Sequence, residues 1–88
     1  MHVRFPMPEA EERRRLWRAL IPKAAPTANE LRLEQLGDTF AMSGGYIRNA
    51  VLRAAFLAAD AKSVIDAAHL ARAAQLEYEA MGKVVARN

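Results

Sequence analysis

The amino-acid sequence predicts an all-α protein, a compact four-helix bundle with one short extended segment. Apolar residues recur at helical spacing in four stretches, and prolines and a glycine pair separate these stretches. Alanine is the most frequent residue, so many apolar side chains are small enough to let helices approach closely. With 88 residues, the chain can form a single small domain. The predicted helices cover residues 8–21, 33–41, 45–60 and 66–81.

The first predicted helix begins at Pro8, because the missing N–H of proline costs nothing at the first helical position. Acidic residues follow at once and arginines come later, an order that suits the helix dipole. Pro22 ends the helix, since proline cannot continue one. We expect Trp17 to anchor the core from an apolar stripe made of Leu16, Trp17, Leu20 and Ile21.

The second predicted helix is short and follows a loop. Residues 22–29 contain two prolines and show no periodicity, which is typical of a loop. Leu33, Leu36 and Phe40 then repeat at spacings of three and four, which predicts a helix over 33–41. Residues 42–45 interrupt the pattern, and we expect Ser43 to cap the next helix with its hydroxyl.

The helix predicted over 45–60 is the central element of the expected bundle. One face carries Leu52 and Phe56 together with Ala59, and the opposite face is also apolar. A helix that is apolar on nearly all sides is typically buried. We therefore expect neighbouring helices to cover both faces of this helix. The face opposite Leu52 and Phe56 is formed by Ile47, Ala50, Val51, Ala54, Leu57 and Ala58.

The last predicted helix covers 66–81 and follows a turn over 60–63 and the extended, apolar pair Val64 and Ile65. Asp66 is a good N-cap residue because its carboxylate can accept hydrogen bonds from the free N–H groups of the first turn. Gly82 is expected just past the helix end, at the C′ position that glycine favours.

Composition excludes several classes of protein. The chain has no cysteine, which rules out disulfides, thiolate metal sites and a thiol nucleophile and is consistent with the cytoplasmic location that we expect. It has no apolar run long enough to span a membrane, and its first residues lack the apolar core of a signal peptide. The net charge of +3 permits a phosphate-bearing partner without requiring one, and the whole excess lies in residues 1–23.

No catalytic or metal-binding residues are predicted. The two histidines, His2 and His69, have no partners at metal-ligand spacing, and His69 is read as a partly exposed helix residue. The acids near residue 10 suit a helix start rather than an acid–base pair. The sequence also lacks the glycine-rich loop with lysine that cradles phosphates.

Two local features leave alternatives open. The first is the arginine group Arg13, Arg14, Arg15 and Arg18, of which the three consecutive ones span most of a helical turn and so cannot all face one partner. We expect a solvated face with pairs such as Glu11 to Arg15, and contact with a neighbouring protein or a nucleotide is the open alternative. The other feature is Gly44 and Gly45, which make either a simple helix break or a place where a ligand approaches the backbone closely, near free N–H groups.

Taken in order, the motifs resemble the small C-terminal helical lid of AAA+ ATPases, and in particular the bacterial Cdc48-like group, in which an F-P-x-P segment leads into the lid. The resemblance covers essentially the whole chain. The residues that carry it are Phe5, Pro6, Met7 and Pro8; Arg13, Leu16 and Trp17; Leu33, Glu34, Gln35, Leu36 and Phe40; Ser43 to Ala50; and Ala54 to Ala59.

The resemblance implies a nucleotide-sensing lid that closes over ATP. Leu16 and Leu20 match residues that pack near the adenine and ribose, and Gly44 and Gly45 match the small pair beside the base. Many such ATPases carry a sensor-2 arginine directly after that pair, where this chain has Tyr46. Arg48 lies two residues further on and either replaces that arginine or points elsewhere.

The implied partners are the large ATPase domain of the same parent chain and the neighbouring subunits of a homo-oligomeric ring, most simply a hexamer. The large domain would supply the Walker motifs and hold Mg²⁺, so we expect the 88 residues to be an excised piece of a larger chain that binds ATP only weakly and is monomeric alone. Two alternatives are a helix-turn-helix-like DNA-binding module, reading bases with Arg48, Asn49 and Arg53, and a helical bundle that only binds proteins.

Overall fold

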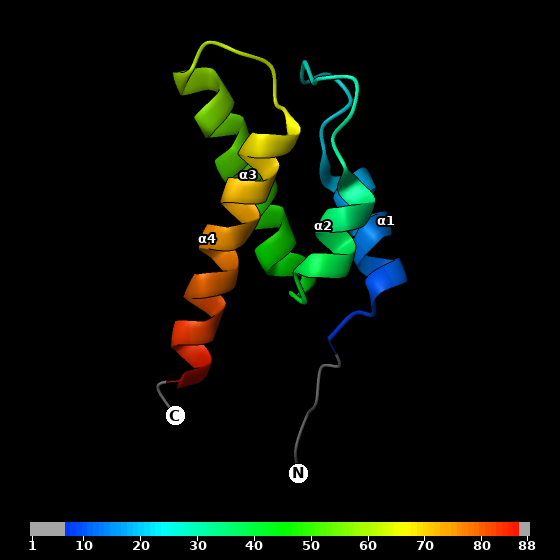
Figure 1. Cartoon of the computed structure of the whole chain (residues 1–88), viewed down its shortest axis with the longest axis vertical. Helices are drawn as coiled ribbons and strands as arrows, with labels where there is room; N and C mark the ends of the chain where they lie inside the picture. Colours follow the sequence, from blue (N-terminus) through cyan, green and yellow to red (C-terminus); the bar gives the residue numbers. More distant parts are fainter. Residues whose placement is uncertain (1–6, 87–88) are drawn as a thin grey trace.

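The computed structural model describes residues 7–86, with side chains described up to residue 83. It contains four helices, α1 (Ala10–Leu20), α2 (Leu33–Thr39), α3 (Gly44–Asp60) and α4 (Ala67–Ala86), and no strand within the described residues (Figure 1). The prediction of an all-α bundle is therefore confirmed. The predictions for His2, Phe5 and Pro6 lie outside the described residues.

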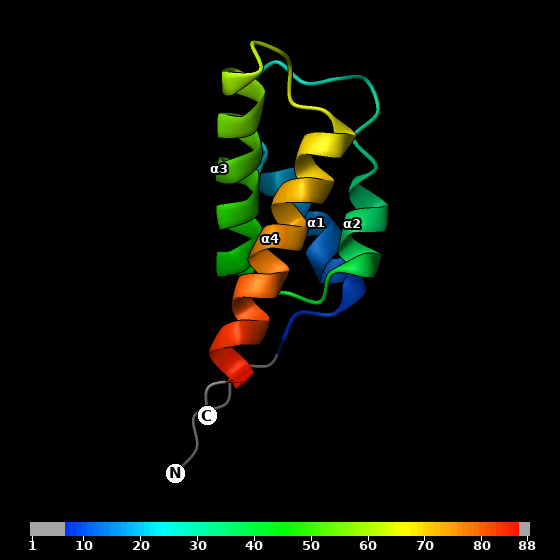
Figure 2. The same ribbon diagram turned by 60° about the vertical axis from the view of Figure 1, so that its left-hand side comes forward.

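The four helices form two antiparallel pairs that stand side by side, α1 with α2 and α3 with α4 (Figures 1 and 2). α1 also packs against α3, so it joins the two pairs, whereas α2 touches α4 only lightly. The extended segment around Ile65 pairs with residues 26–28 and so joins the two helical pairs at the end of the bundle where α1 and α3 end (Figure 1). There the N–H of Ala28 donates to the carbonyl of Ile65 at 2.8 Å, and the N–H of Ile65 donates to the carbonyl of Pro26 at 3.0 Å.

The core lies between the two pairs and contains one large aromatic side chain. Trp17 is fully buried, which confirms its predicted role as the anchor, and Met42, Ile47 and Leu70 are the other large side chains without exposed surface. Alanines fill the α3–α4 contact, which lets these two helices lie close together. The alanines buried there are Ala50, Ala54, Ala58, Ala73 and Ala74.

The N-terminal caps of α3 and α4 differ from each other. Asp66 caps α4 as predicted, since its Oδ1 accepts a hydrogen bond from the His69 N–H at 2.8 Å. The Nδ1 of His69 in turn accepts from the Asp66 N–H at 3.2 Å, an arrangement similar to a capping box. The prediction for Ser43 was wrong, because this residue occupies the N-cap position of α3 but its side chain makes no capping hydrogen bond.

Two helix ends also differ from the predictions. α4 continues through Gly82 to Ala86, so the expected stop at this glycine was wrong. None of the described glycines has a positive φ, and therefore Gly82 does not adopt the left-handed conformation that ends a helix at C′. α1 begins at Ala10 rather than at Pro8, because Glu9 is extended with a ψ of 168°.

The prediction that α3 is covered on both faces was wrong. Its inner face lies in the core, but Phe56 keeps 76% of its surface exposed and Leu52 keeps 51%. The reason is that α1 and α4 pack only against the inner side of α3. An apolar outward face is therefore left without cover among the described residues.

Candidate functional site

The start of α3 brings together most of the residues that the sequence singled out. Ser43 is extended and leads directly into Gly44 and Gly45, the first two residues of the helix. Gly44 faces α1, where a Cβ at this position would lie 3.8 Å from Cδ1 of Leu16. Gly45 is exposed, and a Cβ there would meet nothing within 4 Å. Gly44 thus lies beside an apolar side chain, whereas the backbone at Gly45 is exposed to solvent.

An open hollow of about 430 Å³ lies beside Gly45 and is lined by Ser43, Gly45, Tyr46, Arg48, Asn49 and Leu52. Arg48 is exposed and forms no ion pair or side-chain hydrogen bond with the residues whose side chains are described. A guanidinium without a partner in such a hollow is well suited to contact an anion. The start of α3 therefore combines open backbone with an available positive charge.

Two leucines of α1, Leu16 and Leu20, were also expected at the nucleotide site. Leu16 and Leu20 are both half-buried and pack against the core. Leu16 lies beside the position of Gly44, but neither leucine lines the hollow. The structure thus brings Leu16 to Gly44 and Gly45 to Arg48, and it places Leu20 one helical turn further along α1.

The prediction that the three consecutive arginines of α1 cannot all face one partner is confirmed, because Arg13 and Arg14 contact α2 whereas Arg15 does not. The predicted solvated face was wrong for Arg13. Arg13 is buried and donates from Nε to the carbonyl of Gly37 at 2.7 Å. Arg14 pairs with Asp38 at 2.8 Å, and Arg18 lies 3.6 Å from Glu34. Arg15 and Arg18 fit the predicted solvated face, because both are exposed, and Arg15 forms the predicted pair with Glu11 at 2.9 Å.

Gly37 is a structurally important residue that the sequence analysis missed. An added Cβ would lie 2.6 Å from Cγ of Arg14 and 2.9 Å from its backbone nitrogen. The glycine therefore allows α1 and α2 to touch at the backbone. No local pattern reveals this, because the contact comes from a residue 23 positions earlier in the chain.

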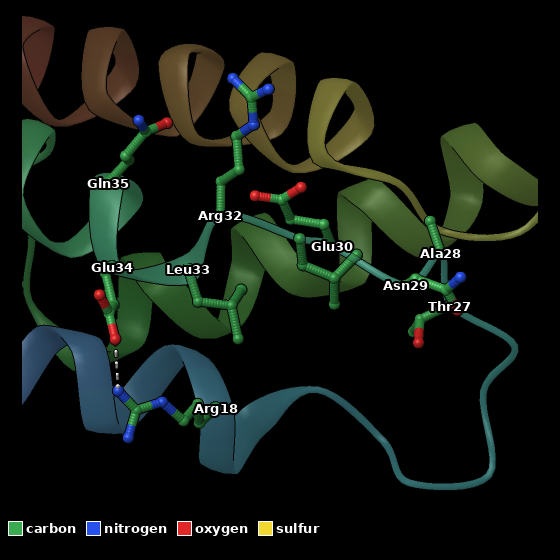
Figure 3. A pocket seen from close by; sticks show the side chains of 10 residues that line it. Arg18, Thr27, Ala28, Asn29, Glu30, Arg32, Leu33, Glu34 and Gln35 are labelled. Atoms are coloured by element: carbon green, nitrogen blue, oxygen red, sulfur yellow. Dashed lines mark ion pairs between the residues drawn. The ribbon is translucent and has the colours of Figure 1, made fainter.

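A second hollow, of about 790 Å³, lies over the segment that connects α1 to α2 (Figure 3). Its charges are mixed, since Arg18 and Arg32 stand near Glu30 and Glu34. Arg32 has a left-handed backbone with a φ of 55°, and its side chain points towards α4 while Leu33 points away from it (Figure 3). The opposite charges give this hollow no clear preference for an anion or a cation.

The described residues offer little support for other kinds of site. They contain no group of three metal-ligating side chains, and none of their helices is long and apolar enough to cross a bilayer. Reading DNA bases from α3 would need Arg53, but this side chain is bound to Glu77 at 2.8 Å. The DNA-binding alternative therefore requires an existing ion pair to break.

Comparison with known families decides what kind of domain this is. Residues 9–79 match the family described as the contractile injection system ATPase helical domain. The chain belongs to this family. A comparison with curated proteins finds no match. The family match confirms the prediction of a helical domain of an ATPase-related protein, and it includes all of α1, α2 and α3 and most of α4.

Proposed function

We propose that this helical domain is the nucleotide-sensing lid of its parent ATPase, of the type found in the Cdc48-like group. The term parent ATPase means the protein that contains both this helical domain and the domain that binds ATP. In this proposal the lid closes over ATP, and hydrolysis changes the angle between the two domains. That movement shifts the neighbouring subunit of a cytoplasmic homo-oligomeric ring, most simply a hexamer.

The observation that carries the proposal is the composition of the α3 start. Gly45 gives open backbone and Arg48 gives an available cation in the same hollow. Leu16 lies beside the neighbouring Gly44, outside the lining of that hollow, and would supply an apolar contact. A nucleotide needs these three kinds of contact, an apolar surface and close backbone approach for the base, and a positive charge for phosphate. Leu20 would extend this apolar contact along α1 if the domain closes.

In this proposal the lid alone binds a triphosphate weakly or not at all. Its sequence lacks a phosphate-binding glycine loop, and its described residues lack a cluster of carboxylates for Mg²⁺. ATP and Mg²⁺ would therefore be bound mainly by the ATPase domain, and the lid would complete one wall. In this arrangement Arg48 would act in place of the sensor-2 arginine by approaching the γ-phosphate.

Steady-state kinetics of the parent ATPase test the proposal. Gly45→Val places two methyl groups where the base must approach, so we expect a several-fold higher KM for ATP. Gly82→Val is the matched control, because Gly82 is also helical and its Cβ would also meet open space. An unchanged KM in a folded Gly45→Val protein would contradict the proposal.

Arg48→Ala separates the role of the charge from that of the backbone. If Arg48 contacts the γ-phosphate during transfer, its loss lowers kcat and leaves KM nearly unchanged, because that contact strengthens in the transition state. A kcat equal to that of the wild type would show that Arg48 does not contact the γ-phosphate. The role of Gly45 is tested separately by Gly45→Val.

A further inference from the structure

The outward face of α3 carries an apolar surface that the described residues do not cover. Phe56 is 76% exposed and Leu52 is 51% exposed, and the two lie one helical turn apart on the same side. The opposite side of the same helix is buried in the core, so this face cannot turn inward. Phe56 and Leu52 are the two most exposed large apolar side chains among the described residues, and adjacent exposed apolar side chains mark a candidate interaction surface.

This surface is hollowed beside Phe56, where α3 meets α4. A hollow of about 720 Å³ beside Phe56 is lined by residues of α3 and by Glu77 of α4. Arg53 donates from its guanidinium to the carboxylate of the buried Glu77 at 2.8 Å, which ties the two helices together beneath the hollow. Asn49 and Leu52 line both this hollow and the one at the α3 start. The two hollows therefore form one continuous surface.

We infer that the α3 outward face, formed by Asn49, Leu52, Phe56 and Asp60, docks on the ATPase domain of the same parent protein, with Phe56 as the anchor. This inference rests on the proposed function. In the proposed function the ATPase domain brings the nucleotide to Gly45 and Arg48. Because Asn49 and Leu52 line both that hollow and the one beside Phe56, a domain docked at the first hollow adjoins Leu52 and Phe56.

The size of the patch favours a tethered domain over a second copy of the chain. A stable complex between separate proteins buries roughly 800 Å² on each partner. A phenylalanine contributes only about 150 to 250 Å², so two apolar side chains on one helix fall short. A domain joined by the same chain needs less surface, because tethering gives it a high effective concentration.

The charges at the two ends of the α3 outward face indicate which charges the docking domain should carry. Arg48 stands at the N-terminal end and Asp60 at the C-terminal end, while Arg53 between them is already paired with Glu77. The complementary surface therefore brings an anion to the Arg48 end, as a bound nucleotide phosphate would, and a basic side chain to Asp60.

Hydroxyl-radical footprinting of the isolated 88-residue chain and the intact parent ATPase tests this inference, since side-chain oxidation follows exposure. We expect oxidation of Phe56 and Leu52 to fall several-fold in the intact ATPase. Tyr78 is the internal control, because it is 41% exposed on α4 and packs edge-on against Phe40. Equal oxidation of Phe56 in both proteins would overturn the inference.

Two other occupants of this face would give different results, and either of those results would overturn the docking that we infer. Protection of Phe56 in the isolated chain at millimolar concentration would indicate a second copy. Protection that disappears when the ring dissociates into single subunits would indicate the neighbouring subunit. Protection with an unchanged KM in Gly45→Val would support the docking face while contradicting the nucleotide role of the α3 start.

A variant pair provides a second measurement in the intact ATPase. Phe56→Ser should restore oxidation of Leu52, because the anchor is lost while the exposed position tolerates serine. Val64→Ser, at a position that is 42% exposed in the turn before α4, should leave Leu52 protected. Protection of Leu52 that persists in Phe56→Ser would show that Phe56 is not the anchor.

Discussion

Gly37 is the residue at which one added methyl group should have the largest effect on stability. The alanine Cβ would lie 2.6 Å from Cγ of Arg14 and 2.9 Å from its backbone nitrogen, and the backbone atom cannot rotate away. We expect Gly37→Ala to lower the free energy of unfolding by about 1 to 2 kcal/mol, since overpacking outweighs the gain in helix propensity. Thermal melts of the isolated chain would measure this, and a Tm equal to or above that of the wild type would contradict it.

Gly82 should respond in the opposite direction. It lies inside α4 with nothing within 4 Å of an added Cβ. Alanine there should raise the free energy of unfolding by about 0.5 to 1 kcal/mol, because it fixes the helical backbone at a lower entropic cost. Loss of stability in Gly82→Ala would mean that this part of α4 is not helical in solution.

The glycines also show which single-residue roles can be read from a sequence. Gly44 and Gly45 interrupt a helical pattern, and this local signal identified the start of α3 correctly. Gly37 lies within a helical pattern, and its role depends on Arg14 from another helix. Likewise the sequence showed that Glu11 can pair with Arg15, but not that Arg13 would be buried against Gly37.

At the scale of single helices, the caps of α3 and α4 give a matched pair of substitutions. Asp66→Ala removes the acceptor for the His69 N–H and should lower the free energy of unfolding by about 1 kcal/mol. Ser43→Ala should change it by no more than a few tenths of a kcal/mol, because the Ser43 side chain makes no capping bond. Urea denaturation of both variants would measure the difference, and equal losses would contradict the assignment of the caps.

The contact between α3 and α4 depends on one ion pair of unequal burial. The side chain of Glu77 is only 7% exposed, whereas that of Arg53 is 47% exposed. Arg53→Met leaves a buried carboxylate without its partner, and we expect a loss of about 1 to 3 kcal/mol. Adding Glu77→Leu should recover part of that loss, because it removes the unpaired charge. No recovery in the double variant would show that Arg53 acts mainly through packing.

The helices could be predicted because each has its own apolar spacing and its own breakers. Their ends were less predictable, since Gly82 has a strong preference for helix ends but adopts a helical conformation in α4. The exposure of Leu52 and Phe56 could not be predicted either. Spacing shows that a face is apolar, but whether a neighbouring helix covers it depends on how the pairs pack.

At the scale of the whole molecule, two helical pairs joined by α1 present the α3 start and the α3 outward face on one continuous surface. The sequence placed Gly44, Gly45 and Arg48 at this end, and the structure adds Asn49 and Leu52 as the link to Phe56. The role of Asn49 and Leu52 in connecting the two hollows could not be predicted from the sequence, because it depends on which side of α3 stays exposed in the fold.

The most direct test of the central claim is photolabelling of the parent ATPase with 8-azido-ATP, followed by tryptic mapping of the cross-linked site. Trypsin cleaves after Arg32 and Arg48, so residues 33–48 are released as one peptide that contains both Gly44 and Gly45. If the start of α3 lies beside the base, this peptide carries the label, and unmodified ATP competes it away. Labelling of the ATPase domain with none on residues 9–79 would contradict the nucleotide-sensing role.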